Sequence, residues 1–91
     1  MSIFKEIDRV IRLEIETLEK LRESLGDSSV QAVELLLKIS GSVVVTGAGK
    51  SGHIAQKIAA TMVSTGTPAL FLHPADAMHG DIGIIRKGDL V

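Results

Sequence analysis

The sequence predicts an α/β domain with a parallel sheet, on the evidence of three consecutive segments. Residues 43–46 and 69–72 are short apolar runs without polar alternation, which is typical of parallel strands that are covered on both faces. Between them, apolar residues recur at helical spacing and would supply the crossover that two parallel strands require. Strand, helix and strand in this order indicate the start of a right-handed parallel layer.

Before this layer, residues 1–40 are expected to form a helical lead-in. Within residues 2–25, apolar residues recur at spacings of three and four and would form one stripe along a helix. The stripe consists of Phe4, Ile7, Ile11, Ile15, Leu18, Leu21 and Leu25. It could cover the core of this domain or a partner subunit, and the sequence leaves both possibilities open. A second helix is predicted in the segment that follows and ends before Gly41.

Residues 43–91 are expected to contain the start of the parallel layer. The helix between the first two strands should carry one apolar face, made of Ile54, Ala55, Ile58, Ala59, Met62 and Val63. The apolar run at 82–85 predicts a further strand, and Leu90 and Val91 the first residues of another. This sheet would have few strands and an unpaired edge. We therefore expect residues 1–91 to be the N-terminal part of one longer domain.

Composition excludes several classes of protein. The chain of 91 residues is 45% hydrophobic with a mean hydropathy of +0.32, which is too apolar for a disordered segment. Its net charge of −1, with scattered Lys and Arg, argues against nucleic-acid binding. The sequence has no cysteine, so disulfides and thiolate metal sites are excluded. No apolar run approaches a membrane span or a signal peptide, so we expect a cytoplasmic protein without membrane contact.

The glycine loop at 47–52 joins the first strand to its helix and is the first candidate site. Gly47, Gly49 and Gly52 match G-x-G-x-x-G, and Lys50 and Ser51 lie inside the motif. Backbone N–H groups at a helix N-terminus attract anions, and glycines let that backbone approach a ligand closely. The same glycines could instead form a tight turn that only packs the helix on the strand.

Two nucleotide-binding interpretations fit this loop poorly. A Walker A loop would need a glycine at position 44, where the sequence has Val44. A dinucleotide site would need an acidic residue at the end of the second strand, and the nearest acid, Asp76, follows a proline. A lysine inside the loop favours a compact and strongly charged ligand, such as a sugar phosphate.

The second candidate site is the histidine loop "HPADAMHGD" at 73–81. It follows the second strand, at the sheet edge where open α/β sheets build their sites. His79 is the candidate for proton transfer near neutral pH, whereas His73 and Asp76 are expected to hydrogen-bond the loop itself. Asp81 should accept backbone N–H bonds. A metal site is not expected, because two histidines and two aspartates without defined spacing are weak evidence for one.

Residues 43–85 resemble the opening of a sugar isomerase (SIS) domain. The shared motifs are G-x-G-K-S-G-H-I, S-T-G-T-P and H-P-x-[DE]-A-x-H-G-D-[IL]-G, and the third is particular to the arabinose-5-phosphate isomerases of this family. The resemblance implies a three-layer αβα sandwich of the doubly wound type around a parallel sheet, in a homodimer or homotetramer. It also implies interconversion of arabinose 5-phosphate and ribulose 5-phosphate, a step toward the acid sugar of lipopolysaccharide, without a redox cofactor.

Carried over by motif, the resemblance assigns Lys50 and His79 to catalysis. It assigns Gly47, Gly49, Ser51 and Gly52 to the loop around the sugar phosphate. The family's serine-rich phosphate loop, S-x-S-G-x-S-x-E, is absent from these residues, so this chain alone is expected to be weakly active or inactive. The alternative is a regulatory SIS module that binds phosphosugars without turning them over, because a sensor needs the anion site but not His79.

Overall fold

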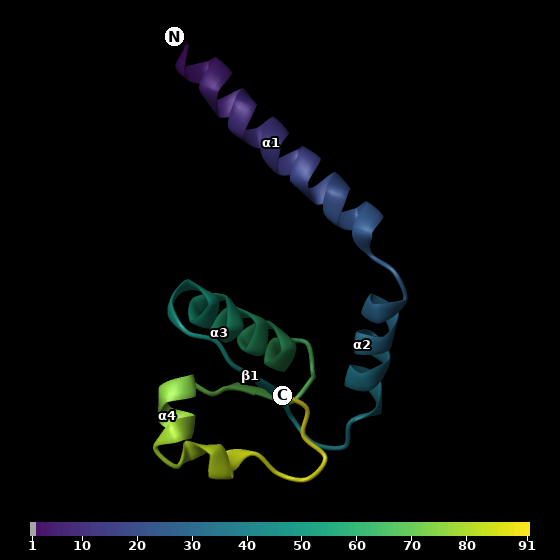
Figure 1. The fold of residues 1–91 in the computed structure, drawn as a ribbon, viewed down its shortest axis with the longest axis vertical. Coiled ribbons are helices and arrows are strands. Elements are labelled where there is room, and N and C mark those ends of the chain that lie inside the picture. The colour runs from purple at the N-terminus through teal and green to yellow at the C-terminus, as the bar shows by residue number, and fades with distance from the viewer. Residues whose placement is uncertain (1) are drawn as a thin grey trace. The chain divides into compact units, whose positions relative to one another are not determined.

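The computed structural model describes residues 2–91, which divide after Val33 into two compact units. The first unit is dominated by α1, Ile3–Ser24, the long helix that begins near the N-terminus in Figure 1. Ser2 begins this helix by accepting the N–H of Lys5 at 3.3 Å, and Arg12 pairs with Asp8 at 2.8 Å along it. The predicted helix over 2–25 is therefore confirmed.

The apolar stripe of α1 lies on the surface of its unit. Phe4, Ile7 and Leu18 are 77%, 57% and 64% exposed, and α1 has no buried residue. The second helix, α2, is Asp27–Lys38 and continues from the first unit into the second. Because α1 buries none of its stripe, its helical form rests on propensity, capping and surface ion pairs rather than on core packing.

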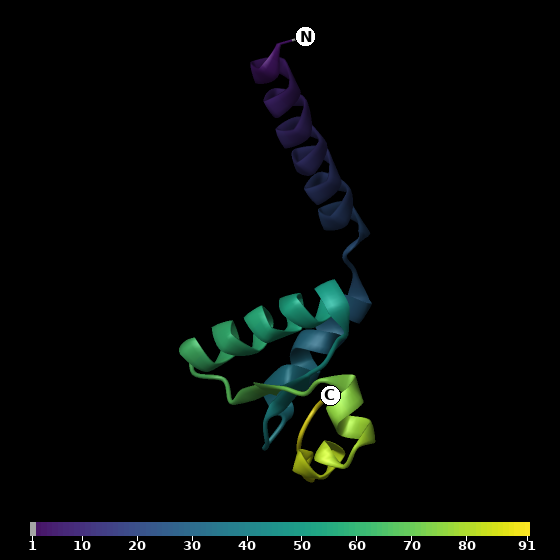
Figure 2. The same ribbon diagram turned by 90° about the vertical axis from the view of Figure 1, so that its left-hand side faces the viewer.

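The second unit contains the predicted strand–helix–strand layer. Its elements are β1 Val43–Val45, α3 Gly49–Ser64, β2 Ala69–Phe71, α4 Pro74–Met78 and the 3₁₀ turn η1 Asp81–Ile84. The strands pair in parallel, with Val44 opposite Leu70, and α3 packs against both of them (Figure 2). The α/β class with a parallel sheet is thus as predicted.

The core of this unit is small and aliphatic. It consists of Val43, Val44, Ala55, Ala59 and Leu72. Alanines bring α3 close to the strands, as expected, but only part of its predicted apolar face turns inward. Ile54, Ile58 and Val63 are 60%, 42% and 56% exposed within the described residues. These three residues lie next to Ala55 and Ala59 on the helix surface. Helical spacing alone does not show which of the two neighbouring rows is buried against the sheet.

The apolar run at 82–85 is not a strand, which corrects the sequence prediction. Gly80 turns the chain with a φ of 115°, and Asp81–Ile84 form the 3₁₀ turn η1, in which Ile85 N–H donates to Ile82 at 3.1 Å. Short apolar runs do not distinguish strand from helix by periodicity. Leu90, where the sequence predicts the start of another strand, forms an isolated parallel bridge with Val43, so β1 lies between β2 and Leu90.

The amino end of β1 is fastened by Asp89. Its carboxylate accepts the backbone N–H of Ser42 at 2.7 Å and of Arg86 at 2.8 Å. These two bonds lower the pKa of Asp89 below its ordinary value. Gly41 is required beside it, because a Cβ there would collide with the Asp89 carboxylate. The two hydrogen bonds of Asp89 therefore hold the start of β1 beside the segment that leads to Leu90.

No helix within residues 2–91 combines the length and apolar character that crossing a bilayer requires.

Candidate functional site

The start of α3 is open. Its N-cap residue is Ala48, whose backbone is extended and whose side chain makes no capping bond, and Gly49 follows with a left-handed φ of 57°. Gly52 N–H is bonded to the Ala48 carbonyl at 3.2 Å, so the amides of Gly49, Lys50 and Ser51 precede the intrahelical ladder. The first turn of α3 also contains no acidic residue. The positive end of the helix dipole is therefore not neutralised by the protein at this point.

The three glycines of the loop do different things. A Cβ on Gly52 would lie 2.6 Å from the carbonyl oxygen of Gly47, and one on Gly47 would lie 3.0 Å from the backbone of Ser51. These two residues thus let the loop backbone touch the first turn of α3. Gly49 has open space around it but a φ of 57°, a conformation that side chains disfavour. Packing and backbone conformation account for all three glycines.

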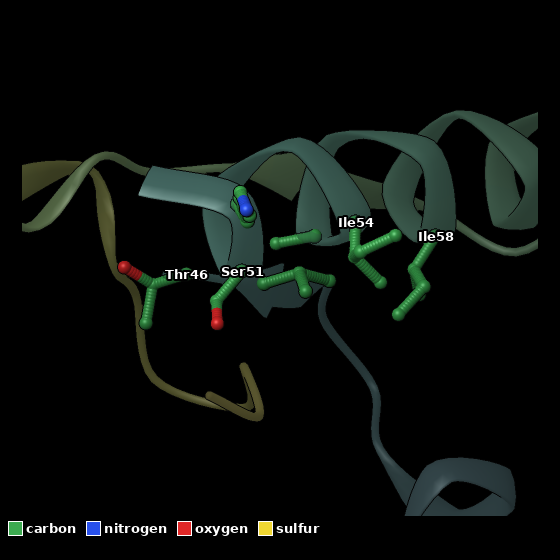
Figure 3. Close-up of a pocket in the computed structure, with 7 residues that line it drawn as sticks. Thr46, Ser51, Ile54 and Ile58 are labelled. Carbon is green, nitrogen blue, oxygen red and sulfur yellow. The ribbon is translucent and has the colours of Figure 1, made fainter. Parts of the chain in front are cut away.

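Lys50 and Ser51 lie at a hollow between β1 and α3. The hollow, of about 370 Å³, is lined by Val45, Thr46, Lys50, Ser51, Ile54, Ala55 and Ile58. Figure 3 shows the hydroxyl-bearing side chains of Thr46 and Ser51 near one another at the loop end, with Ile54 and Ile58 farther along the helix. The hollow therefore has a polar end, beside the free amides of α3, and an apolar end. Only the loop end of the hollow, where Lys50 and Ser51 line it, offers groups that could contact an anion.

Thr46 is a lining residue that the sequence analysis missed. Its hydroxyl donates to the carbonyl of Leu72, so it joins the ends of β1 and β2. The signal in the sequence was its place as the last residue of the strand before the glycine loop. Thr46 was treated there only as part of the strand.

The histidine loop folds into α4, with a histidine at each end. The imidazole Nδ1 of His73 accepts the N–H of Ala75 at 3.0 Å and caps the helix, so the expectation that His73 hydrogen-bonds its own loop is confirmed. His79 is the C-cap residue, and its N–H bonds to the carbonyls of Ala75 and Asp76 at 3.2 and 3.1 Å. His79 is exposed to solvent.

Parallel pairing brings the two loops to the same edge of the sheet. β1 and β2 run in the same direction, and Leu72 N–H donates to the Val45 carbonyl at 3.0 Å just before the loops diverge. Lys50 and Ser51 share one hollow, which His79 does not line. Next to α4, a second hollow is lined by Phe71, Leu72, His73, Asp76, Gly80, Asp81 and Ile84.

The expectation that Asp76 and Asp81 hydrogen-bond backbone groups of the histidine loop is wrong, because among the hydrogen bonds within residues 2–91 neither side chain makes one. The expected role thus belongs to Asp89, which accepts one N–H from nearby Arg86 and one from Ser42, 47 positions away in the chain. Within the same residues, no group of three histidines or acids is placed to hold a metal ion.

The part of the chain that contains this site is similar to known proteins. The SIS domain family matches residues 36–91. The chain is 52% identical over 83 residues to arabinose 5-phosphate isomerase GutQ of Escherichia coli K12, covering 91% of this chain and 26% of that protein. It is 55% identical over 91 residues to arabinose 5-phosphate isomerase KdsD of Pseudomonas aeruginosa, covering 100% and 28%. The chain thus spans about a quarter of the length of these relatives.

Two solved structures share this fold at 37% sequence identity. A Bacteroides fragilis protein described as a phosphosugar isomerase involved in capsule formation aligns with a TM-score of 0.89 and 37% identity, over 97% of this chain and 47% of that one. The E. coli CFT073 protein c3406, solved in complex with arabinose 5-phosphate, aligns with a TM-score of 0.84 and 37% identity, over 98% and 49%.

Proposed function

Because the chain belongs to the SIS domain family, we propose that it carries a glycine loop that contacts the sugar phosphate and the proton-transfer histidine of an arabinose 5-phosphate isomerase. The reaction interconverts D-arabinose 5-phosphate and D-ribulose 5-phosphate and needs no redox cofactor. Support comes from the arabinose 5-phosphate isomerases GutQ and KdsD, and from the complex of c3406 with the sugar phosphate. The observation that carries the proposal is the uncapped start of α3, which has Lys50 in its first turn and no acid there.

The phosphate is proposed to lie against the loop 47–52. The amides of Gly49, Lys50 and Ser51 would donate to its oxygens, and Ser51 would add its hydroxyl. An anion there complements the helix dipole and is attracted by the Lys50 ammonium. Gly47 and Gly52 would act through the backbone, because they allow the loop to approach both the helix and the ligand.

The chemistry after binding is a proton transfer between two carbons. The open-chain aldose loses the proton on C2, an enediolate forms, and a proton returns to C1 to give the ketose. This sequence needs an acid–base group and a positive charge near the developing oxyanion. We assign proton transfer, in ring opening or at carbon, to His79. Lys50, at the same sheet edge, would stabilise the oxyanion or the phosphate.

The binding half of the proposal is tested on the 91-residue chain by calorimetry with arabinose 5-phosphate. Lys50→Ala should weaken binding about 10- to 100-fold, the worth of one charge-assisted contact. Lys57→Ala is the matched control, because Lys57 lies on the same helix but does not line the hollow with Lys50. Equal affinities of Lys50→Ala and the unsubstituted chain would refute the anion site.

The catalytic half needs a complete domain. The 83 residues of this chain that align with E. coli GutQ can replace the matching segment of that protein, and the chimera can be assayed for ribulose 5-phosphate. We expect turnover by the chimera and far slower turnover by the 91-residue chain. The chain has no glutamate after Glu34, and an incomplete site forgoes much of the positioning contribution, which reaches roughly 7–11 kcal/mol. A chain as fast as the chimera would show that the catalytic set lies within these residues.

A sensory SIS module is the second candidate, and one observation favours it. The hollow that contains Lys50 and Ser51 is formed without His79, so the proposed anion site does not depend on the proposed proton-transfer group. The chimera separates the two functions. Binding of arabinose 5-phosphate with no turnover by a folded chimera would favour the sensor.

The proposal also includes self-association, a cytoplasmic location and a role in lipopolysaccharide sugar synthesis. The exposed stripe of α1 supports a homodimer or homotetramer, since a monomer seldom leaves so much contiguous apolar surface in water. Light scattering at micromolar concentration should give a mass above that of one chain, and a monomeric mass would contradict this.

A further inference from the structure

We propose that His73 is a positioning residue for His79, acting through the single helical turn of α4. The placement of His79 follows from contacts within this chain. Its consequence for turnover rests on the proposed function of His79. His73 itself has no assigned part in proton transfer.

The first step is the cap that His73 makes. Its Nδ1 accepts the N–H of Ala75 at 3.0 Å, and its carbonyl accepts the N–H of Ala77 at 3.0 Å. Because Nδ1 acts as an acceptor, the neutral ring carries its proton on Nε2. Pro74 follows at the first helical position, where its fixed φ suits the helix and its missing N–H costs nothing. His73 therefore holds the start of α4 with both side chain and backbone.

The second step is that the same residue, Ala75, holds both histidines. Its N–H is bonded to the His73 ring, and its carbonyl accepts the N–H of His79 at 3.2 Å. α4 is only five residues long, Pro74–Met78, and a helix this short does not persist in water on its own propensity. The cap at one end thus contributes directly to the position of the backbone at the other.

The third step is the contact that ties His73 to the sheet. Its ring meets the ring of Phe71 edge-to-face, with centroids 6.3 Å apart and planes at 75°. Phe71 is the last residue of β2, and the Leu72 that follows is buried, at 8% exposure. The contacts thus run from β2 through Phe71, His73 and Ala75 to His79. Through them the sheet determines where the exposed His79 lies.

The test compares two substitutions at one position by NMR on the 91-residue chain. His73→Ala removes the acceptor, whereas His73→Asn supplies another, because asparagine is a favoured N-cap residue. In His73→Ala we expect the Ala75 amide to exchange about tenfold faster and the His79 ring resonances to move toward those of an unstructured peptide. In His73→Asn both should stay close to those of the unsubstituted chain. The imidazole nitrogen shifts of unsubstituted His73 should report the Nε2–H form.

Asp89→Ala is the matched control for general loss of stability. It removes backbone hydrogen bonds at the other end of β1, so it should destabilise the sheet without moving the His79 resonances. Unchanged His79 resonances in His73→Ala, together with faster exchange at Ala75, would overturn the proposal. So would failure of His73→Asn to restore them while the amides of β1 remain protected.

Kinetics in the GutQ chimera add a readout that a purely structural role would not move. His73→Ala should lower kcat about tenfold with KM for arabinose 5-phosphate unchanged, and His73→Asn should recover most of the loss. Normal kcat in His73→Ala, in a chimera whose His79→Asn variant is impaired, would overturn the positioning role. If His79→Asn leaves kcat of the chimera unchanged, the proposed function of His79 is refuted. The NMR comparison then still decides whether His73 determines the position of His79.

Discussion

Two helices, α3 and α4, begin at the same edge of the sheet, and they differ in whether a side chain caps the first turn. α3 begins after Ala48, which offers no side-chain cap, and its first turn carries Lys50 and no acid. α4 begins after His73, whose ring fills the capping position itself. One helix start is thus left open to solvent, and the other is closed by the protein.

The difference shows how neighbouring loops of one sheet take different roles. An open helix N-terminus presents unpaired donors and positive potential, which a phosphate can satisfy. In a closed one a side chain already bonds a first-turn donor, as the His73 ring bonds the Ala75 N–H, and we propose that α4 in turn holds His79. In this comparison the glycine loop works through its backbone and the histidine loop through a side chain. Four substitutions test this division, from the largest expected effect to the smallest.

His79→Asn, made in the GutQ chimera, tests the side-chain role. Loss of one acid–base group should lower kcat by about two to four orders of magnitude, while the affinity for arabinose 5-phosphate changes little. The measurement is the rate of ribulose 5-phosphate formation. His53→Asn is the control, because His53 is exposed on α3 and should leave kcat as it is. Similar kcat values for the two variants would contradict the assignment of His79.

Gly52→Ala tests the backbone role of the glycine loop. The new Cβ would lie 2.6 Å from the Gly47 carbonyl oxygen, and backbone atoms cannot give way cheaply. We expect the free energy of unfolding in urea to fall by about 2–3 kcal/mol. Gly83→Ala has no neighbour within 4 Å of its Cβ and should change stability far less. Equal stability of both variants would mean that the close approach is dispensable.

Ala48→Asp would close the open helix and so turn α3 into a counterpart of α4. The carboxylate should cap the first turn and raise the free energy of unfolding by about 1 kcal/mol. It should also weaken binding of arabinose 5-phosphate by about tenfold, because it occupies the same amides and repels the phosphate. Gln56→Asp adds the same charge farther along α3 as a control. The opposite signs of stability and affinity are the diagnostic result, and affinity equal to that of Gln56→Asp would contradict it.

The smallest effect is expected at the opposite edge of the sheet, where neither helix start takes part. The bonds from Ser42 and Arg86 lower the pKa of Asp89 from its ordinary value of 3.8. The folded state therefore binds this proton less readily than the unfolded state does. The stability contributed by Asp89 is complete above its ordinary pKa and is lost as the pH falls through the lower, folded-state pKa.

Asp89→Asn should accordingly flatten the fall in unfolding free energy between about pH 5 and pH 3. The measurement is the urea midpoint at several pH values for the substituted and unsubstituted chains. Binding of arabinose 5-phosphate at neutral pH should be the same in both, because Asp89 lies away from the two loops. Parallel pH profiles would show that Asp89 does not titrate with unfolding.

Local patterns in the sequence determined most of what was predicted correctly. The helix over 2–25, the strands at 43–46 and 69–72, and the helix between them follow from the spacing of apolar residues among near neighbours. The order of the motifs identified the family, and His73 was correctly expected to bond its own loop, a contact made two residues along the chain. Lys50, His79 and the binding role of the loop 47–52 remain predictions.

Tertiary structure decided the features that depend on residues far apart in the chain. Asp89 accepts a local N–H from Arg86, three residues away, but it reaches Ser42 across 47 positions, and that second bond depends on the folded chain. Thr46 joins the site because β2 lies beside it. Ile54 and Ile58 remain exposed because the row of α3 that is buried consists of Gly52, Ala55 and Ala59. Periodicity reports which residues share a face of a helix, whereas burial depends on what that face meets.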